Sequence, residues 1–445
     1  MTYAARHLPA HLGPAAWDAI LPARVPCPPV SADTTADVAI IGGGFAGLAA
    51  ARRLTQLQPD AKIVVLEAGH IAEGASGRNS GFMIDLPHDL ASNDYAGTGD
   101  DRGRIALNRH AQSFAAEAVD DYGIDPTFFD RAGKINGAAS KAAEAHNQSY
   151  ARHLASLGET SEHLDAQAMR QITGSAHYRS GLYTPGTIML QPAGFIRGMA
   201  DGLRRRGVHI FERTPALALT QSGPDWQIAT LTARITTPRV ILTVNGHLES
   251  FGIRRDRLLH VFLFATMTPE LPADALKALG GQPRWGITPA DPMGTTVRRI
   301  DTPQGGNRIV TRTCAVLRSG LRATPADLSR AARVMQSKFD SRFPGLAGMK
   351  MEYAWAGHLC LTQNAVSVTG EVEPGLFSAC AQNGLGTTRG TLTGIAAAEL
   401  ASGETSDITR HFTAEPDPTK LPHRIVRDRG ANALLRWKEW KARRD

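Results

Sequence analysis

The segment Asp37-Val38-Ala39-Ile40-Ile41-Gly42-Gly43-Gly44-Phe45-Ala46-Gly47 decides the fold of this chain. Its first five residues form a short run rich in β-branched side chains, which is typical of a buried parallel strand. The Ala- and Leu-rich stretch 48–57 after the glycines predicts a helix, and Lys62-Ile63-Val64-Val65-Leu66-Glu67 predicts a second strand. Strand, glycine turn, helix and strand together make one βαβ unit.

The glycine spacing in this unit indicates a dinucleotide site. Gly42 permits a tight turn, Gly44 lets the backbone approach a pyrophosphate, and Gly47 lets the helix pack closely on the strand. The helix N-terminus offers N–H groups and partial positive charge to the phosphates. Glu67, 20 positions after Gly47, can accept hydrogen bonds from ribose hydroxyls and would repel a 2′-phosphate.

Two further glycine-rich loops lie at opposite ends of the chain. The first, Gly74-Ala75-Ser76-Gly77-Arg78-Asn79-Ser80-Gly81, could open another helix, and its arginine could neutralise a diphosphate. Taken alone, it is also compatible with an ordinary Gly/Ser loop. The second, residues 382–391, follows a predicted strand at 375–381 and precedes a predicted helix at 392–400. Loops so far apart in sequence suit a long cofactor such as FAD better than NAD.

The rest of the chain predicts a second kind of architecture. Residues 104–122 and 140–158 have the composition of helices, and 239–246 predicts another buried strand ending in a turn. Residues 295–300 and 308–316 flank a turn-rich segment and predict an antiparallel hairpin. A parallel α/β part interrupted by an antiparallel part indicates two interleaved domains.

Composition excludes several classes of protein. With 445 residues, 42% hydrophobic and 20% charged, the chain is long enough for two or three globular domains and is not disordered, collagen-like or a coiled coil. Its four cysteines form no CxxC pair, which argues against a disulfide framework or a cysteine zinc site. No signal peptide and no membrane span are visible in the sequence, so we expect a cytoplasmic protein.

On residues 37–54, 74–81 and 375–394, the chain resembles the FAD-dependent D-amino-acid-oxidase-like superfamily. In appearance it is most similar to glycine and sarcosine oxidases and to γ-glutamylputrescine oxidoreductase-like enzymes. Less specific similarities continue the resemblance over about residues 37–403, namely Gln191-Pro192-Ala193-Gly194, Gly207-Val208 followed by Pro215-Ala216, Asn245-Gly246, and Tyr353-Ala354-Trp355-Ala356-Gly357.

The resemblance implies an α/β (α+β) fold in which a Rossmann-like FAD-binding domain is interleaved with an antiparallel-sheet substrate domain. We expect an N-terminal arm at 1–30 and a basic helical tail at 411–445. Between them we expect the FAD-binding domain at 31–88, 146–250 and 352–410, and the substrate-binding domain at 89–145 and 251–351.

The resemblance also assigns the FAD site. It places the adenine at the Val208 backbone, the adenosine ribose at Glu67 and Ala68, and the pyrophosphate at Gly42, Gly44, Phe45, Ala46 and Gly47. The pyrophosphate and flavin would also lie along Ser76, Arg78, Asn79 and Ser80, and the Asn245-Gly246 turn would lie beside the cofactor. The isoalloxazine ring would lie at Gly384, Leu385, Gly386, Thr387 and Thr388. A helix beginning near Gly390 would aim its positive end at the N1–C2=O edge of that ring.

We expect the FAD to be non-covalent. Several relatives attach the flavin through a histidine in the early glycine-rich loop or through a cysteine elsewhere. The loop position is Ser80 here, which cannot form that bond. Cys314, Cys360 and Cys380 remain open as attachment points from sequence alone.

The implied activity is oxidation of a CH–NH bond of an amine or amino acid. Hydride would pass to flavin N5, the imine would hydrolyse to an aldehyde or keto acid, and O₂ or another acceptor would reoxidise the flavin. The amine lone pair supplies the electronic push, so no dedicated base, triad or metal is expected.

Six arginines against one acid in 298–322 suggest an anionic substrate end, because guanidinium binds carboxylate bidentately. Candidate contacts are Arg298, Arg299, Arg312 and Trp355; a solvated sheet edge is the competing interpretation for each arginine.

Two alternatives belong to other classes: an FAD-dependent RNA-modifying enzyme, and a non-catalytic FAD-binding subunit of a larger dehydrogenase. The net charge of +7 gives little support to nucleic acid, because residues 422–445 and 298–322 carry +5 each and leave −3 for the remainder. In the tail, Leu434, Trp437 and Trp440 recur at helical spacing, which predicts a stripe packed on the body of the protein.

Overall fold

A computed structural model describes residues 1–87, 100–291 and 293–445. Its six-stranded sheet carries the glycine-rich motif, in the order β11 (His209–Phe211), β4 (Ile63–Leu66), β3 (Val38–Ile41), β15 (Val240–Leu242), β22 (Leu376–Cys380) and β21 (Val368–Glu373). All neighbouring strands are parallel except β21, which pairs antiparallel at one edge. The side chains of β3 and β4 are buried throughout, because both faces of this sheet are covered.

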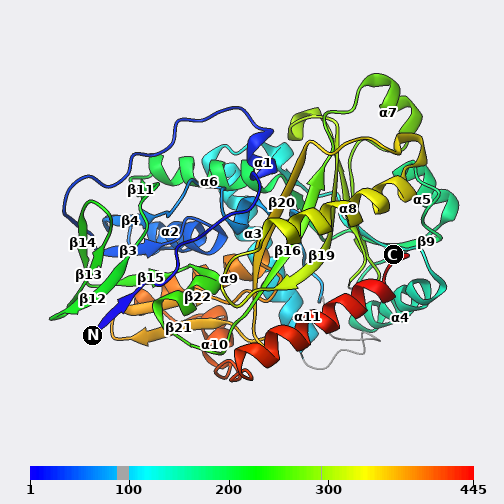
Figure 1. The fold of residues 1–445 in the computed structure, drawn as a ribbon. Coiled ribbons are helices and arrows are strands. Elements are labelled where there is room, and N and C mark those ends of the chain that lie inside the picture. The colour runs from blue at the N-terminus through cyan, green and yellow to red at the C-terminus, as the bar shows by residue number, and fades with distance from the viewer. Residues whose placement is uncertain (88–99, 292) are drawn as a thin grey trace.

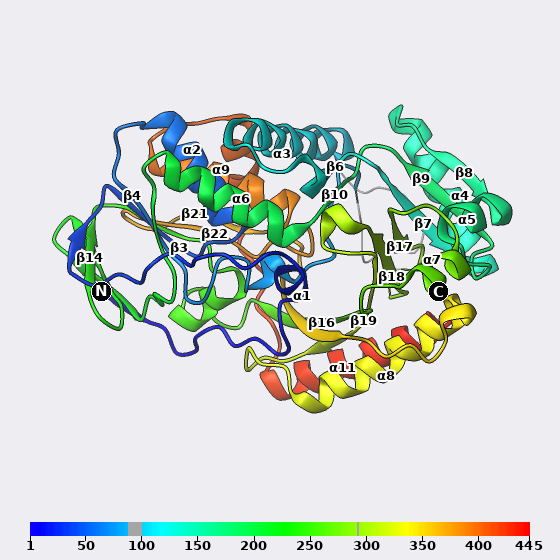
Figure 2. The same cartoon turned by 90° about the horizontal axis from the view of Figure 1, so that it is seen from above.

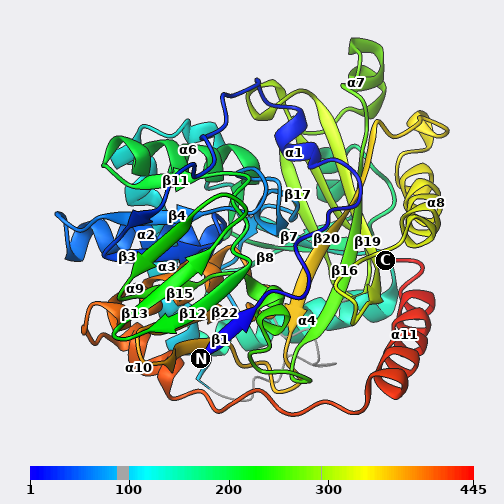
Figure 3. The same cartoon turned by 60° about the vertical axis from the view of Figure 1, so that its left-hand side comes forward.

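Helices cover one face of this sheet and a second sheet covers the other (Figures 1 and 3). The helices are α2 (Phe45–Leu57), α9 (Thr388–Ala401), α6 (Pro192–Arg205) and α3 (Asp101–Tyr122). The second sheet has the order β1 (Thr2–Ala4), β12 (Ala218–Ser222), β13 (Asp225–Ala229), β14 (Arg234–Thr237) and β2 (Thr34–Thr35). Because β1 pairs with β12, the start of the expected N-terminal arm is an edge strand of this second sheet.

An eight-stranded sheet forms the other half of the molecule (Figure 2). Its order is β20 (Tyr353–Leu361), β16 (Leu259–Met267), β19 (Arg308–Leu317), β18 (Thr296–Ile300), β17 (Trp285–Pro289), β7 (Lys134–Ala138), β9 (Ser180–Thr184) and β8 (Glu162–Asp165). Only the β17–β7 pair is parallel. The helices around it are α8 (Pro325–Arg342), α4 (Lys141–Leu157), α5 (Ala166–Thr173), α7 (Ala273–Leu279) and α11 (Arg424–Lys441).

The remaining elements are short. A three-stranded sheet has the order β5 (Phe82–Met83), β10 (Ile188–Leu190) and β6 (Phe129–Asp130). The two short α-helices are α1 (Ala16–Ala19) and α10 (Asp407–Thr413), and the 3-10 turns are η1 (Ala75–Gly77), η2 (Pro126–Phe128), η3 (Asn245–Phe251), η4 (Thr302–Gln304) and η5 (Pro344–Leu346). The loop at 74–81 thus opens one 3-10 turn and not a longer helix.

The expected fold class is confirmed, and the predicted hairpin exists as the antiparallel pair β18–β19. The structure divides the chain differently from the expected ranges, however. Strands β8 and β9, expected in the nucleotide half, pair within the eight-stranded sheet. Helix α3, expected in the substrate half, packs on α6 and α9. The local sequence of a short strand or an amphipathic helix does not specify which sheet it will join.

The tail forms the predicted helix α11, but the predicted burial of its apolar stripe is wrong. Leu434, Trp437 and Trp440 are all more than half exposed. In the part of the chain that the structure describes, no helix combines the length and the apolar character needed to cross a membrane.

Candidate functional site

One cavity of about 390 Å³ brings the two halves of the protein together. Its wall includes the β3–α2 turn, the end of β4, residues 74–84 and the loop at 382–387, together with side chains from β16, β18, β19 and β20. Small-molecule sites usually fall in this range of volume. Segments from both ends of the sequence therefore share one cavity.

The glycines of the β3–α2 turn are held by close contacts. Gly42 has a φ of +110°, which disfavours other residues. A Cβ on Gly47 would lie 1.9 Å from the Gly42 carbonyl oxygen, so only glycine lets α2 pack at this distance. A Cβ on Gly44 would lie 2.5 Å from Ser76 Oγ, which accepts a 3.1 Å hydrogen bond from the Phe45 N–H. Gly42, Gly44, Phe45 and Ala46 line the cavity, whereas Gly47 lies behind them.

Glu67 lies at the cavity wall after β4, and Ala68 lines the cavity beside it. Its Oε2 accepts a 2.9 Å hydrogen bond from the Gly43 N–H, and its Oε1 accepts a 3.0 Å bond from the Gly69 N–H. Burial raises the pKa of Glu67, and these two N–H groups act in the opposite direction. Each carboxylate oxygen retains a second lone pair, so Glu67 can still accept a hydrogen bond from a ribose hydroxyl.

The loop at 74–81 is fixed from the side of β20. The Trp355 indole N–H donates a 3.0 Å bond to the Arg78 carbonyl. The Arg78 guanidinium donates to the carbonyl oxygens of Glu73 (2.6 Å) and Gly13 (2.9 Å), and burial lowers its pKa to about 10. Arg78 thus ties three segments together beside the cavity. Ser76, Arg78, Asn79 and Ser80 line the cavity, but Trp355 does not.

The C-terminal loop closes the cavity from the opposite end of the chain. Thr387 Oγ1 donates a 2.8 Å bond to the Phe82 carbonyl, and Thr388 Oγ1 donates a 3.0 Å bond to the Ile84 carbonyl. The Ala381 N–H donates a 3.1 Å bond to Asn245 Oδ1. Asn245, Gly384, Leu385, Gly386 and Thr387 line the cavity; Gly246 and Thr388 do not. Helix α9 begins at Thr388, so its positive end lies at this wall.

Of the three candidate arginines, only Arg312 lines the cavity. Its Nη1 lies 3.5 Å from Thr296 Oγ1, and burial lowers its pKa to about 10. Arg298 lies on the same face of the sheet, but its guanidinium donates to the carbonyls of Ser80 and Leu190 and lies near aromatic rings. Arg299 points to the opposite face and donates to the Gly280 carbonyl.

Val208, whose backbone is expected to contact adenine, is not among the residues that line the cavity. Its side chain is buried in the core, and its N–H donates a 3.1 Å bond to the Leu203 carbonyl at the end of α6. Pro215 and Ala216, further along the same segment, line the cavity instead. Strand β11 lies between Val208 and these two residues, and the segment that follows the strand is the one that reaches the cavity.

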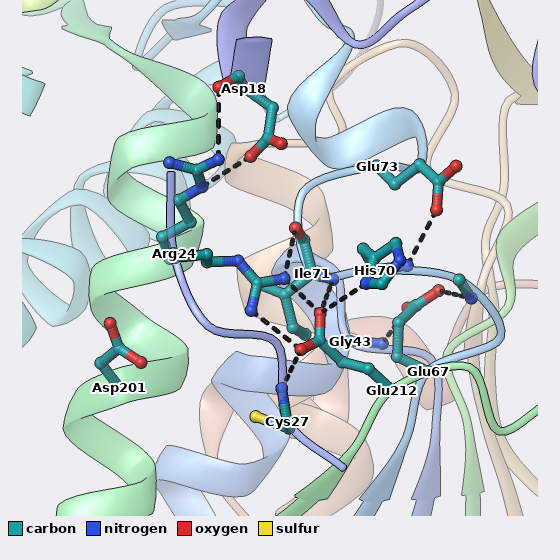
Figure 4. Close-up of polar contacts among 12 residues, drawn as sticks. Asp18, Arg24, Cys27, Gly43, Glu67, His70, Ile71, Glu73, Asp201 and Glu212 are labelled. Carbon is teal, nitrogen blue, oxygen red and sulfur yellow. Dashed lines mark hydrogen bonds and ion pairs between the residues drawn. The ribbon is translucent and has the colours of Figure 1, made fainter. Parts of the chain in front are cut away.

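A buried carboxylate, Glu212, joins the N-terminal arm to the loop after β4 (Figure 4), and no local pattern in the sequence marks it. Glu212 accepts hydrogen bonds from the Arg24 side chain and from the N–H groups of Cys27 and Ile71. Burial raises the pKa of Glu212, but these donors outweigh burial and hold the pKa below its ordinary value. Nearby, Glu67 and Gly43 make the separate contact already described (Figure 4).

Histidines and the N-terminal arm, which sequence reasoning did not assign, also line the cavity. They are His7, Leu8, Pro9, Ala10 and His11 of the arm, and His247 and His358. Behind the wall, His260 lies 3.3 Å from His358 and 2.5 Å from Glu249, measured between ring nitrogens and from ring nitrogen to carboxylate oxygen. Burial lowers the pKa values of His247 (to about 4) and His358. Burial therefore favours the neutral form of both rings.

A family model described as "DAO: FAD dependent oxidoreductase" matches residues 37–400. The chain belongs to this family. "Probable oxidoreductase OrdL" of Rhizobium meliloti (strain 1021) is 25% identical over 401 residues, covering 88% of this chain and 89% of the relative. "Gamma-glutamylputrescine oxidoreductase" of Escherichia coli (strain K12) is 25% identical over 378 residues, covering 83% and 84%.

Solved structures agree on the fold of this DAO-family chain. Glycine oxidase from Geobacillus kaustophilus superposes with a TM-score of 0.69 at 17% identity, over 86% of this chain and all of that one. An L-amino acid deaminase from Proteus vulgaris superposes with a TM-score of 0.66 at 16% identity, over 86% and 97%. At these identities the likeness concerns the fold.

The cofactor of the family fits the residues present. The glycine turn leaves no room for a Cβ at Gly44, and Glu67 faces the cavity with spare lone pairs. The N-terminal ends of α2 and α9 meet the same cavity, which suits the anionic groups of FAD. The chain is thus an FAD-dependent oxidoreductase of the DAO family.

Proposed function

We propose that this oxidoreductase acts on the C–N bond of a small amine or amino acid whose anionic end is bound by Arg312. The observation that carries the proposal is the position of this guanidinium on the cavity wall. Among the described residues, no carboxylate forms an ion pair with Arg312, and burial alone accounts for its lowered pKa. A substrate carboxylate would supply the missing counter-charge through a bidentate contact.

The neighbours of Arg312 suit a small, polar-ended substrate. Thr296 and Thr288 contribute hydroxyl groups to the wall, and Leu263, Phe264 and Leu359 contribute apolar surface. The hydroxyl groups can hold a polar end in one orientation, while the apolar side chains exclude water from the reacting carbon. Bound FAD supplies the hydride acceptor.

The names of the relatives support the same class of substrate. Glycine oxidase, L-amino acid deaminase and gamma-glutamylputrescine oxidoreductase are all named for amino acids or for an amine derivative. The resemblance places the isoalloxazine ring by residues 384–388, and that loop shares its cavity with Arg312. We extend the substrate class to this chain on these two grounds.

The test compares Arg312→Ala with Arg299→Ala, a buried arginine of the neighbouring strand that lies outside the cavity. For an amine substrate with a carboxylate, Arg312→Ala should raise KM by about tenfold to a hundredfold, the worth of one charge-assisted pair. Arg312→Lys should restore part of the loss, and Arg299→Ala should leave KM unchanged. Equal KM values for the wild type and Arg312→Ala would refute the role of this arginine.

A further inference from the structure

The C-terminal helix α11 is fixed to the body by its inner face. The Asn432 side chain accepts a 2.9 Å bond from the Leu317 N–H and donates a 3.0 Å bond to the Leu317 carbonyl, at the end of β19. Glu439 accepts a 2.8 Å bond from the Ala315 N–H and pairs with Arg330 of α8 at 3.0 Å. These contacts fix the rotation of the helix about its own axis.

Helix α11 runs along the outside of the molecule (Figures 1 and 3). With its inner face fixed, an apolar stripe of the helix remains exposed. Val426, Gly430, Ala433, Trp437 and Trp440 recur at spacings of four and three, which places them on one side of a helix. All five are exposed. The exposed fractions of Trp437 and Trp440 are 53% and 61%, far above what a structural tryptophan shows.

The exposed apolar side chains of the protein concentrate on this helix. Nine large hydrophobic residues of the described chain are exposed, and five of them belong to α11: Ile425, Val426, Leu434, Trp437 and Trp440. Single exposed hydrophobic residues need no explanation, but a cluster on one surface marks an interaction site.

The charge around the stripe is entirely positive. Exposed basic side chains lie beside it, namely Arg429, Lys441, Arg443 and Arg444, whereas Arg424 at the start of the helix pairs with Asp428 at 3.8 Å. The acidic residues of the helix point inward: Asp428 accepts a 2.5 Å bond from the Ser319 hydroxyl on the body, and Glu439 binds Ala315 and Arg330. Lys441 and Arg443 lie over the rings of Trp437 and Trp440, at 5.7 and 4.5 Å from the ring centroids.

We propose that the outer face of α11 docks the protein on an anionic membrane surface, with the helix axis parallel to that surface. Indole rings favour the interface between headgroups and acyl chains, and Lys and Arg on either side can bind anionic headgroups while their stems cover apolar surface. The charges of this helix preclude insertion across the bilayer, so it lies in the interface.

Charge and chemistry favour a lipid surface over two other partners of this face, a second copy of the chain and RNA. A second copy of the same face would bring the basic side chains of both helices together with no acidic partner, and this repulsion opposes a symmetric dimer. RNA would satisfy the charges and could stack on the tryptophans, but it would leave the aliphatic side chains Ile425, Val426 and Leu434 in water. Lipid accommodates both the apolar and the basic parts.

The experiment is sedimentation of the FAD-loaded full chain with vesicles. One set contains phosphatidylcholine alone and the other contains phosphatidylcholine with phosphatidylglycerol. We expect binding to the anionic vesicles that weakens as salt is raised, and little binding to the neutral ones. Failure to bind anionic vesicles at low salt would overturn the proposal.

Substitutions test whether the outer face of α11 is the surface that binds the vesicles. Trp437→Ala combined with Trp440→Ala, and separately Lys441→Glu combined with Arg444→Glu, should each weaken vesicle binding by about tenfold or more. Leu231→Ala and Arg206→Glu change exposed residues elsewhere and should leave binding unchanged, with flavin content and melting temperature as checks on folding. Equal loss in the controls would overturn the assignment to α11. So would a dimer, detected by analytical ultracentrifugation, that the tryptophan variant dissociates, or tight binding of a polyuridine oligonucleotide without vesicle binding.

Discussion

The Thr387 hydroxyl donates a 2.8 Å hydrogen bond to the carbonyl oxygen of Phe82, across a sequence separation of 305 residues. This bond, with its neighbour from Thr388 to Ile84, joins the loop that precedes α9 to the strand after the early glycine-rich loop. The cavity wall is therefore continuous only when the two ends of the chain are folded together. Cofactor binding and closure of the fold should be coupled.

Replacing Thr387 tests this coupling. Thr387→Val keeps the size of the side chain but leaves the buried Phe82 carbonyl without its donor, which costs about 1–3 kcal/mol. We expect FAD affinity, measured by titration of the apoprotein, to fall by about tenfold. The matched control is Thr413→Val, which removes a similar hydroxyl bond on the exposed helix α10. Unchanged FAD affinity in Thr387→Val would show that the bond does not shape the site.

Substitution of Gly47 should affect both the stability of the apoprotein and the binding of FAD. Because its Cβ would lie 1.9 Å from a backbone oxygen, Gly47→Ala should force α2 away from β3. We expect a lower melting temperature for the apoprotein as well as loss of bound flavin. Gly345→Ala is the control, since no atom lies within 4 Å of its Cβ position. An apoprotein of normal stability would contradict the packing role.

The buried carboxylate of Glu212 should make stability depend on pH. Its pKa is lower in the folded than in the unfolded protein, so its contribution is complete above the unfolded value, near pH 4 to 5, and is lost as pH falls toward the folded value. Glu212→Gln should cost about 2–4 kcal/mol at pH 7, because Arg24 is left unpaired.

Thermal melts from pH 7 to pH 3 measure this effect. The difference in stability between wild type and Glu212→Gln should shrink as pH falls below about 5, since protonation removes the advantage of the carboxylate. A difference that stays constant over this range would mean that the charge of Glu212 does not stabilise the fold.

We expect FAD to be bound without a covalent link to the protein. By the resemblance, Ser80 occupies the loop position at which several relatives attach the flavin through a histidine, and all four cysteines are buried outside the cavity lining. Acid precipitation should therefore release all of the yellow colour into the supernatant. Colour retained in the pellet would demonstrate a covalent bond, and digestion would then locate it.

The nucleotide half could be predicted well from sequence because its signals are local. The turn at Gly42 and the contact of Gly47 with the Gly42 carbonyl are properties of a few consecutive residues, and the structure shows both. The loop that ends in Thr387 was recognisable for the same reason. Its partner Phe82 was not, since a hydrogen bond between distant segments leaves no pattern in either.

The substrate half depended on information that the sequence lacks. Arg298, Arg299 and Arg312 were equivalent until the strand register was known, because adjacent residues of a strand face opposite sides. The register of β18 and β19 places Arg312 at the cavity wall and Arg299 on the opposite face of the sheet. For Trp437, helical spacing correctly predicted a stripe but could not tell which side of the helix would meet the body; the contacts of Asn432 and Glu439 decided that.

The substrate class is tested most directly by anaerobic mixing of the flavin-loaded protein with matched pairs of small molecules, followed by the visible absorbance of oxidised flavin. Each pair consists of an amine with a carboxylate end and the hydroxy acid of the same carbon skeleton. At least one carboxylate-bearing amine should bleach the flavin, and the absorbance should return on admission of O₂ or an artificial acceptor. The matched hydroxy acid should cause no bleaching. Bleaching by hydroxy acids alone, or by no amine in a broad panel, would contradict the proposed substrate class.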